Sequence, residues 1–147
     1  MAKKFKNIYF LEHLNSILAW AYYRLNDFNK ALEYLSYNKG LIDHRLIIPD
    51  SVIESLIYFS LENKELLNKA ILNLNNPKTI EHIGEHNSKL IYDLFKLFIE
   101  DNNYNKNPLW GNLLSEINTN IELKKVFNEL LKNYYIINRR YKDALFL

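Results

Sequence analysis

The sequence predicts an all-α protein that forms a single domain over residues 1–147. Three observations lead to this expectation. Apolar residues recur at the i, i+3, i+4, i+7 spacing of a helix buried along one face, almost throughout the chain. Asparagine, glycine and proline residues interrupt these stretches at intervals typical of turns. An aromatic pair also returns after a fixed interval, as it does in stacked helical hairpins.

The first helix is expected over residues 5–25. Its apolar stripe predicts a single buried face that contains Phe10, Leu14, Ile17, Leu18, Ala21, Tyr22 and Leu25. Asn26 and Asp27 then favour a turn, because both residue types are common in turns. A second, shorter stripe predicts a helix over residues 28–38, so the first two helices should form an antiparallel hairpin.

The rest of the chain continues the helical pattern. Further helices are expected over residues 51–62, 64–75, 78–86, 88–101, 108–118, 120–138 and 140–146. Pro49, Pro77 and Pro108 each precede one of these stretches, where a missing N–H group does no harm. Ser51 and Glu54 have the spacing of a capping box, which predicts a helix beginning at Ser51.

An aromatic pair followed by an aliphatic residue, a polar turn and a second apolar stripe occurs repeatedly. The pairs are Tyr22–Tyr23, Tyr58–Phe59 and Tyr134–Tyr135. The first two begin 36 residues apart, and this interval is typical of proteins built from stacked helical hairpins.

One hairpin has a more specific pattern, in which small residues allow two helices to approach and larger ones fill the spaces between them. The residues that form this pattern are Leu18, Ala19, Tyr22, Phe28 and Ala31. Over residues 12–38 the chain therefore resembles the tetratricopeptide family. The resemblance implies antiparallel helical hairpins stacked as a short right-handed solenoid, and a generic right-handed array of helical hairpins is the alternative.

Other parts of the chain depart from the family pattern. Glu54 occupies a position where the family has a buried apolar residue, and Leu67 replaces a small residue of the second helix. Leu131 replaces a small residue in the last unit, and Arg140 lengthens its turn. The unit around residues 88–116 matches only as a pair of helices. The resemblance is therefore strongest at the first hairpin.

The tetratricopeptide resemblance implies a concave groove that holds a peptide or a partner helix. The residues it places there are His13, Ser16, Trp20, Tyr23 and Arg24, with Phe59 and Tyr135 at the matching positions of later units. Tryptophan, tyrosine and arginine are the types that contribute most to binding at protein interfaces. The alternative interpretation is that Trp20 and Tyr23 pack between helices.

The segment His82-Ile83-Gly84-Glu85-His86 has the H-x-x-E-H form found in one class of zinc protease. Two histidines four residues apart share one face of a helix, and a glutamate beside them can activate a metal-bound water. A third ligand is not specified, although Glu116, Glu122 and Glu129 follow in the sequence. Gly84 also weakens a helix here, so exposed histidines without a metal are the preferred interpretation.

Composition narrows the other functional classes. The net charge is +2, with 19 basic and 17 acidic residues, so nucleic-acid binding is not expected. Basic residues at the two ends are interpreted as solvated: Lys3, Lys4, Lys6, Arg139, Arg140 and Lys142. The absence of cysteine, of a secretory signal and of a membrane span favours a cytoplasmic protein.

The sequence therefore predicts a non-enzymatic, cofactor-free module that binds a protein or peptide, as an adaptor, a peptide sensor or an inhibitor. A metal-dependent hydrolase that uses His82, Glu85 and His86 is one alternative. A structural subunit of an oligomer, joined through the apolar end at Phe146 and Leu147, is the other.

Overall fold

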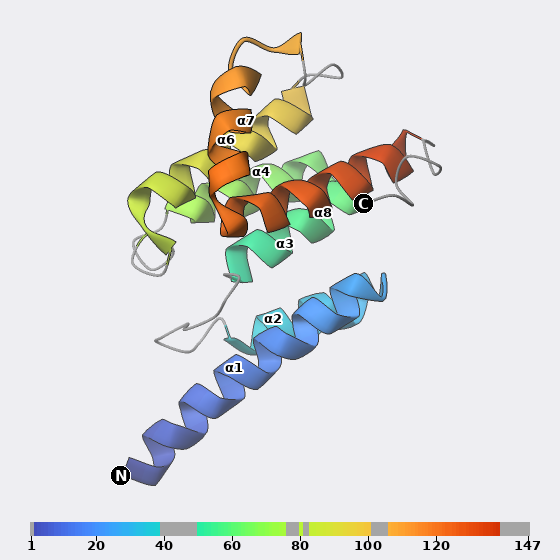
Figure 1. Cartoon of the computed structure of the whole chain (residues 1–147). Helices are drawn as coiled ribbons and strands as arrows, with labels where there is room; N and C mark the ends of the chain where they lie inside the picture. The colour runs from blue at the N-terminus through green and yellow to red at the C-terminus, as the bar shows by residue number, and fades with distance from the viewer. Residues whose placement is uncertain (1, 39–49, 76–79, 81–82, 101–105, 139–147) are drawn as a thin grey trace.

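The computed structural model describes residues 2–38, 50–75, 80, 83–100 and 106–138, and the side chains of these residues except 2–10 and 122. The described residues form helices and turns without a strand, which confirms the all-α prediction. The elements are α1 (Ala2–Arg24), α2 (Phe28–Asn38), α3 (Asp50–Ser60), α4 (Lys64–Leu72), the 3-10 helix η1 (Asn73–Asn75), α6 (Glu85–Glu100), α7 (Trp110–Thr119) and α8 (Ile121–Ile137). Figure 1 shows α1 and α2 side by side along the lower edge of the molecule.

The hairpins α1–α2 and α3–α4 turn in the same way. After α1, the N–H of Asn26 bonds to Tyr23 O and the N–H of Asp27 bonds to Tyr22 O; after α3, Glu62 and Asn63 make the same two bonds to Phe59 and Tyr58. This is the Schellman arrangement, in which one residue takes a left-handed conformation to satisfy the last carbonyls of a helix. Asn26 has φ 61° and Glu62 has φ 56°, so the 36-residue interval of the sequence corresponds to a repeated turn.

Polar side chains begin several of the following helices. The Asp27 carboxylate accepts a hydrogen bond from Lys30 N at 3.3 Å, and Asn63 Oδ1 accepts one from Leu66 N at 3.1 Å. Asn120 Oδ1 accepts a third from Leu123 N at 3.2 Å, at the start of α8. Each bond satisfies an N–H group that has no partner within its own helix, which is why these helices begin where they do.

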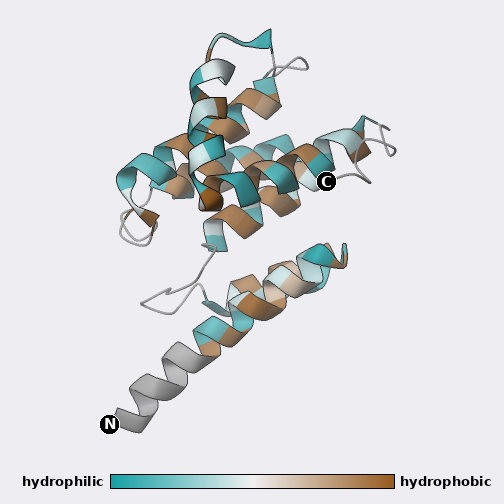
Figure 2. Ribbon diagram, viewed as in Figure 1, coloured by the Kyte–Doolittle hydropathy of each residue, from teal (hydrophilic) through white to brown (hydrophobic). Residues whose placement is uncertain are grey.

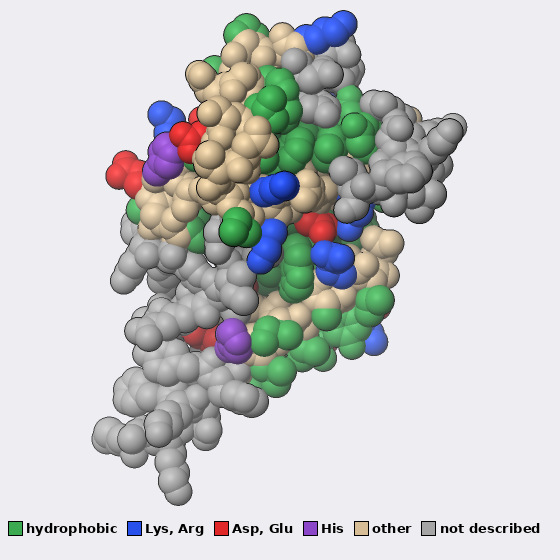
Figure 3. Space-filling model, viewed as in Figure 1, with side chains coloured by type: hydrophobic (Ala, Val, Ile, Leu, Met, Phe, Trp, Pro, Cys, Tyr) green, Lys and Arg blue, Asp and Glu red, His purple; other side chains and the backbone are tan. Residues whose placement is uncertain are grey.

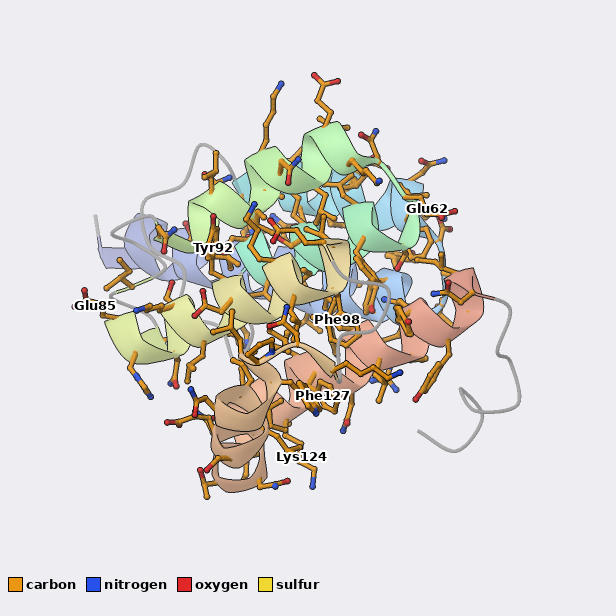
Figure 4. All side chains as sticks on the ribbon, turned by 90° about the horizontal axis from the view of Figure 1, so that it is seen from above. Glu62, Glu85, Tyr92, Phe98, Lys124 and Phe127 are labelled. Atoms are coloured by element: carbon orange, nitrogen blue, oxygen red, sulfur yellow. The ribbon has the colours of Figure 1, made fainter. Side chains whose placement is uncertain are left out.

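The main apolar core lies within the part formed by α3, α4, α6, α7 and α8. Helix α8 packs against α3, α6 and α7. Phe98 of α6 lies at the centre of this part, with Phe127 of α8 beside it (Figure 4). Its ring is 6.3 Å from the rings of Phe59 and Phe127, and 5.4 Å from that of Tyr134. Such ring pairs add to the stabilisation that burial of their area already gives.

Two boundaries differ from the sequence prediction. Helix α3 includes Asp50, so Ser51 lies inside the helix and not at its cap. Glu85 and His86 begin α6, and Gly84, with φ +89°, separates them from the preceding residues because its backbone is left-handed. The helix expected over residues 140–146 lies outside the described residues. Within the described parts of the chain, no helix is both long and apolar enough to cross a membrane.

Candidate functional site

Helix α1 has an apolar face that is exposed and a largely polar face that is buried. The predicted burial of its apolar stripe is therefore wrong. Leu14 is 38% exposed, Ile17 49% and Leu25 73%, and Leu11 beside them is 50% exposed. Ala21 is also exposed, and Leu18 and Tyr22 are half-buried. Figure 3 shows hydrophobic side chains along the lower edge of the molecule, over α1, and Figure 2 shows hydrophobic stretches on the same visible face of the helix.

The buried face of α1 consists of Glu12, Ser16, Ala19 and Tyr23, each at most 2% exposed. These residues follow one another at intervals of four, three and four, so they form a continuous line along the helix. Three of the four side chains are polar, and buried polar groups are stable only with hydrogen-bond partners. The orientation of α1 therefore depends on the partners that the neighbouring helices supply.

The N-terminal half of this face is joined to α2 and α3 through Asn38. Asn38 is 1% exposed, and its Nδ2 donates to Ser16 Oγ at 2.8 Å and to Asp50 Oδ2 at 3.0 Å. Its amide oxygen accepts a hydrogen bond from Asn15 at 3.1 Å, and the Ser16 hydroxyl donates to Asp50 Oδ1 at 2.6 Å. One carboxylate and one amide thus connect three helices.

The C-terminal half of the buried face meets α8 in what we call the Glu129 cluster, formed by Tyr23, Arg24, Glu129, Lys132 and Asn133. The Tyr23 hydroxyl donates to Glu129 Oε2 at 2.9 Å and accepts from Asn133 Nδ2 at 2.8 Å. Arg24 donates to Glu129 Oε1 at 2.9 Å, and Lys132 to Oε2 at 2.8 Å. Glu129 is only 8% exposed, and this buried carboxylate is stabilised by two cationic donors and one hydroxyl donor.

Burial raises the pKa of Tyr23 above the ordinary value for a tyrosine, and the negative charge of Glu129 raises it further. The hydroxyl therefore keeps its proton over the whole neutral range and acts as a hydrogen-bond donor to the carboxylate. This fits a structural role for Tyr23, because a group that gives up its proton so reluctantly is a poor acid at neutral pH.

Apolar residues on the outer side of α1, all exposed except the half-buried Leu18, follow a second regular spacing. We call Leu11, Leu14, Leu18, Ala21 and Leu25 the α1 seam, because their intervals of three, four, three and four are those of two heptads of a coiled coil. Leu25 belongs to it although α1 ends at Arg24, since its N–H still bonds to Ala21 O at 3.1 Å. Ile17 widens the seam on one side.

Two tyrosines, Tyr22 of α1 and Tyr34 of α2, lie beside the seam on the side of α2. The rings of Tyr22 and Tyr34 stack with centroids 5.5 Å apart, and the Lys30 ammonium lies 5.2 Å from the Tyr22 centroid. Tyr37 is exposed on α2, and its hydroxyl donates to a Glu33 carboxylate oxygen at 2.6 Å. The stacked rings hold α2 against α1 and leave the seam uncovered.

The residues predicted to line a concave groove are divided between buried and exposed places. Ser16, Tyr23 and Phe59 are buried, the first two in the contacts with Asp50 and Glu129 and the third against Phe98. Helix α8 packs against α3 and meets α1 through the Glu129 cluster.

The other predicted groove residues are at least partly accessible. Trp20 and Tyr135 are half-buried, and the Trp20 ring lies 5.3 Å from that of Tyr23. His13 is exposed, as is Arg24, whose guanidinium carbon lies 5.8 Å from the Trp20 centroid. Of the predicted groove residues, Ser16 joins α1 to α2 and α3, and Tyr23 and Arg24 join it to α8.

The histidine motif is described only from Ile83 onward. Gly84 has φ +89° and α6 begins after it at Glu85, so His86 lies in the first turn of α6. His82 lies outside the described residues. His86 Nε2 lies 3.4 Å from Glu116 Oε2, and the His86 side chain is exposed while that of Glu116 is half-buried. Glu129, another candidate ligand, belongs to the Glu129 cluster. The described residues contain no group of three or more side chains that could hold a metal.

The sequence contained a signal for the polar face of α1 that the apolar pattern concealed. Glu12, Ser16 and Tyr23 recur on one side of the helix, and Glu129 and Asn133 are four residues apart on α8.

Comparison of the chain with family models, curated proteins and solved structures gave no match. The function is therefore argued from the geometry of α1.

Proposed function

We propose that the protein is a non-enzymatic interaction module that pairs the α1 seam with an α-helix of a partner protein. The supporting observation is the exposure of the apolar side of α1 while its polar side is buried. An apolar stripe on the surface of a protein is typical of an interaction site, because covering it with a partner removes apolar surface from water, which is favourable. The proposal keeps the binding function that the sequence predicts and moves the contact from the inner side of α1 to the outer one.

The spacing of the seam favours a helix as the occupant over an extended peptide. Residues at intervals of three and four form a straight line on a helix, and side chains from a second helix fit between them at a crossing angle near 20°. An extended peptide instead presents its side chains every second residue and gains affinity by pairing with a free strand edge. The described residues contain no strand, so that mode of recognition has no support.

The dimensions of the seam set the size of the partner. From Leu11 to Leu25 it spans about 21 Å at 1.5 Å per residue, which matches a helix of about four turns. Two heptads are fewer than the three or four that identify an independent coiled coil. The partner should therefore bind with moderate affinity, on the order of 1–100 µM, and rely on α1 being held in place by the remaining helices.

A direct test uses a designed peptide of about 18 residues, with leucine at the first and fourth positions of each heptad and equal numbers of glutamate and lysine elsewhere. We expect fluorescence anisotropy to show saturable binding to the folded protein. The double variant Leu14→Glu/Ala21→Glu should bind at least tenfold more weakly, because it buries two charges in the contact.

Leu72→Glu is the matched control. Leu72 is 62% exposed on α4, away from the seam, so its replacement adds a charge and removes an exposed leucine without touching α1. Circular dichroism should show that all three proteins are equally helical. Equal binding by the double variant and the wild type would contradict the proposal, as would a complete lack of binding to the peptide.

A further inference from the structure

We infer that the helix paired with the α1 seam is α1 of a second copy of this chain, in antiparallel orientation. This inference rests on the proposed function and names its partner. It is carried by the order of large and small residues within the seam, by the residues beside the seam, and by the place of α1 at the edge of the molecule.

In an antiparallel pair of α1 helices, the large residues of one seam face small residues of the other at the centre of the contact. In an antiparallel pair of helices, the first position of a heptad faces the fourth position of the other chain. With the two-fold axis between Leu18 and Ala21, Leu18 of each copy faces Ala21 of the other, and Leu14 faces Leu25. A large side chain is thus opposite a small one in the two central layers, which is how facing helices fill space without clashing.

Such a contact has the form required of a two-fold dimer, in which residue i of one copy meets residue j of the other and the reverse also holds. Leu14 and Leu25 are both exposed, and they form the two outer layers with leucine against leucine. The four layers use Leu14, Leu18, Ala21 and Leu25 of both copies, and Leu11 lies beyond the paired stretch.

The residues beside the seam do not specify a different partner. Charged residues in the flanking positions of a coiled coil select partners by their sign. Here the flanking positions hold Asn15 and Tyr22 on one side, and Ile17 and Arg24 on the other. Arg24 is already paired with Glu129 at 2.9 Å within its own chain. The single carboxylate of α1, Glu12, is buried. A second copy therefore meets no row of like charges.

The surroundings of α1 leave its seam accessible. In Figure 1 the helix runs along the edge of the molecule, with α2 beside it and the rest of the fold above. Figure 3 shows the hydrophobic surface over α1 on the same open edge.

The first experiment measures mass against concentration by sedimentation equilibrium, from about 5 to 500 µM, because two heptads support only a weak dimer. We expect the wild type to approach twice its monomer mass at the upper end. Ala21→Glu should weaken association at least tenfold, since it places a charge opposite Leu18 while leaving the fold intact at an exposed position. Leu72→Glu should associate as the wild type does.

The orientation is tested by cross-linking, for which the absence of cysteine from the chain is convenient. We expect a mixture of the Leu14→Cys and Leu25→Cys proteins to form a disulfide-linked dimer on mild oxidation with diamide. Each variant alone should not, because two copies of one position lie about 16 Å apart along antiparallel helices. Leu72→Cys alone is the control for collisional cross-linking.

The outcomes separate this inference from the proposed function. A protein that stays monomeric at 500 µM but binds the designed peptide overturns the second copy and keeps the helix-pairing function. Association that Ala21→Glu leaves unchanged overturns the inference by placing the contact elsewhere. Cross-linking of each single variant with itself, and not of the mixture, replaces antiparallel with parallel pairing. Binding of the monomer to anionic lipid vesicles through the same residues, without peptide binding or dimers, overturns both proposals.

Discussion

The Tyr23 hydroxyl donates a hydrogen bond to the Glu129 carboxylate at 2.9 Å, across a separation of 106 residues in the sequence. The bond joins the first hairpin to the last long helix. Because the carboxylate also accepts hydrogen bonds from Arg24 and Lys132, Glu129 holds the C-terminal half of the buried side of α1, while Asp50 bonds to Ser16 in the N-terminal half. The exposed seam is the consequence of this arrangement.

Removal of the carboxylate should destabilise the fold. We expect Glu129→Ala to lower the free energy of unfolding by about 1–3 kcal/mol, because it leaves the buried Tyr23 hydroxyl without its acceptor. The contribution of the two cations is reduced, since the Arg24 and Lys132 side chains are 55% and 30% exposed to water. Urea denaturation followed by circular dichroism measures the change.

Glu65→Ala provides the control for this experiment. Glu65 pairs with Lys69 at 3.7 Å on the surface of α4, and both side chains are mostly exposed, so its loss should change stability by less than about 0.5 kcal/mol. Equal effects of the two alanine substitutions would show that the Glu129 cluster does not hold α1 in place.

The stability of the fold should also depend on the Tyr23 proton at alkaline pH. The pKa of Tyr23 is raised in the folded state, so the folded protein holds the Tyr23 proton more tightly than the unfolded chain does. The resulting stabilisation is complete below the unfolded pKa of about 10 and is lost as the pH rises above it. We expect the difference in unfolding free energy between the wild type and Tyr23→Phe to shrink by about 1.4 kcal/mol per pH unit above that value.

This difference isolates Tyr23 from the other groups that titrate in the same range. The pKa values of Tyr37 and Tyr58 are also raised, the first mainly by its bond to Glu33 and the second mainly by burial, but both residues are present in the two proteins being compared. Urea midpoints measured between about pH 8 and pH 11 give the result. A difference that does not vary with pH would mean that Tyr23 titrates normally in the folded state.

The helices and the repeated turn could be predicted from the sequence because their causes are local. Apolar spacing identified the helices, and Asn26 with Asp27 identified the first turn. The break at Gly84 was missed because a histidine pair in helical spacing suggested a continuous helix, whereas glycine allows the chain to take a positive φ there.

The orientation of α1 could not be predicted in this way, because it depends on residues far along the chain. The apolar pattern placed Leu14, Leu18 and Ala21 on one side of the helix, and it assigned that side to the core. Only the position of Glu129 and Asp50 shows that the opposite side is buried. Hydrophobic spacing alone locates a contact surface, and it does not show whether the contact is made within the chain.

Glycine at the two left-handed positions should stabilise the fold unequally. A residue with a side chain is strained at φ near +60°, and asparagine tolerates this conformation better than glutamate does. We expect Glu62→Gly, where φ is 56°, to raise the free energy of unfolding by about 1 kcal/mol, and Asn26→Gly, where φ is 61°, to change it by less than about 0.5 kcal/mol. Urea denaturation should give this order, and the reverse order would contradict the turn assignment.

Two alanines of α1 distinguish its buried side from its exposed one. Ala19 is fully buried, so Ala19→Leu forces extra volume into a packed contact and should cost about 1–3 kcal/mol of stability. Ala21 is exposed on the α1 seam, so Ala21→Leu should leave the stability within about 0.5 kcal/mol of the wild type. If the apolar stripe instead faced the core, as its spacing first suggested, Ala21→Leu would be the more damaging change. Thermal denaturation of the two single variants at one low concentration, where association is negligible, therefore decides which side of the helix is buried.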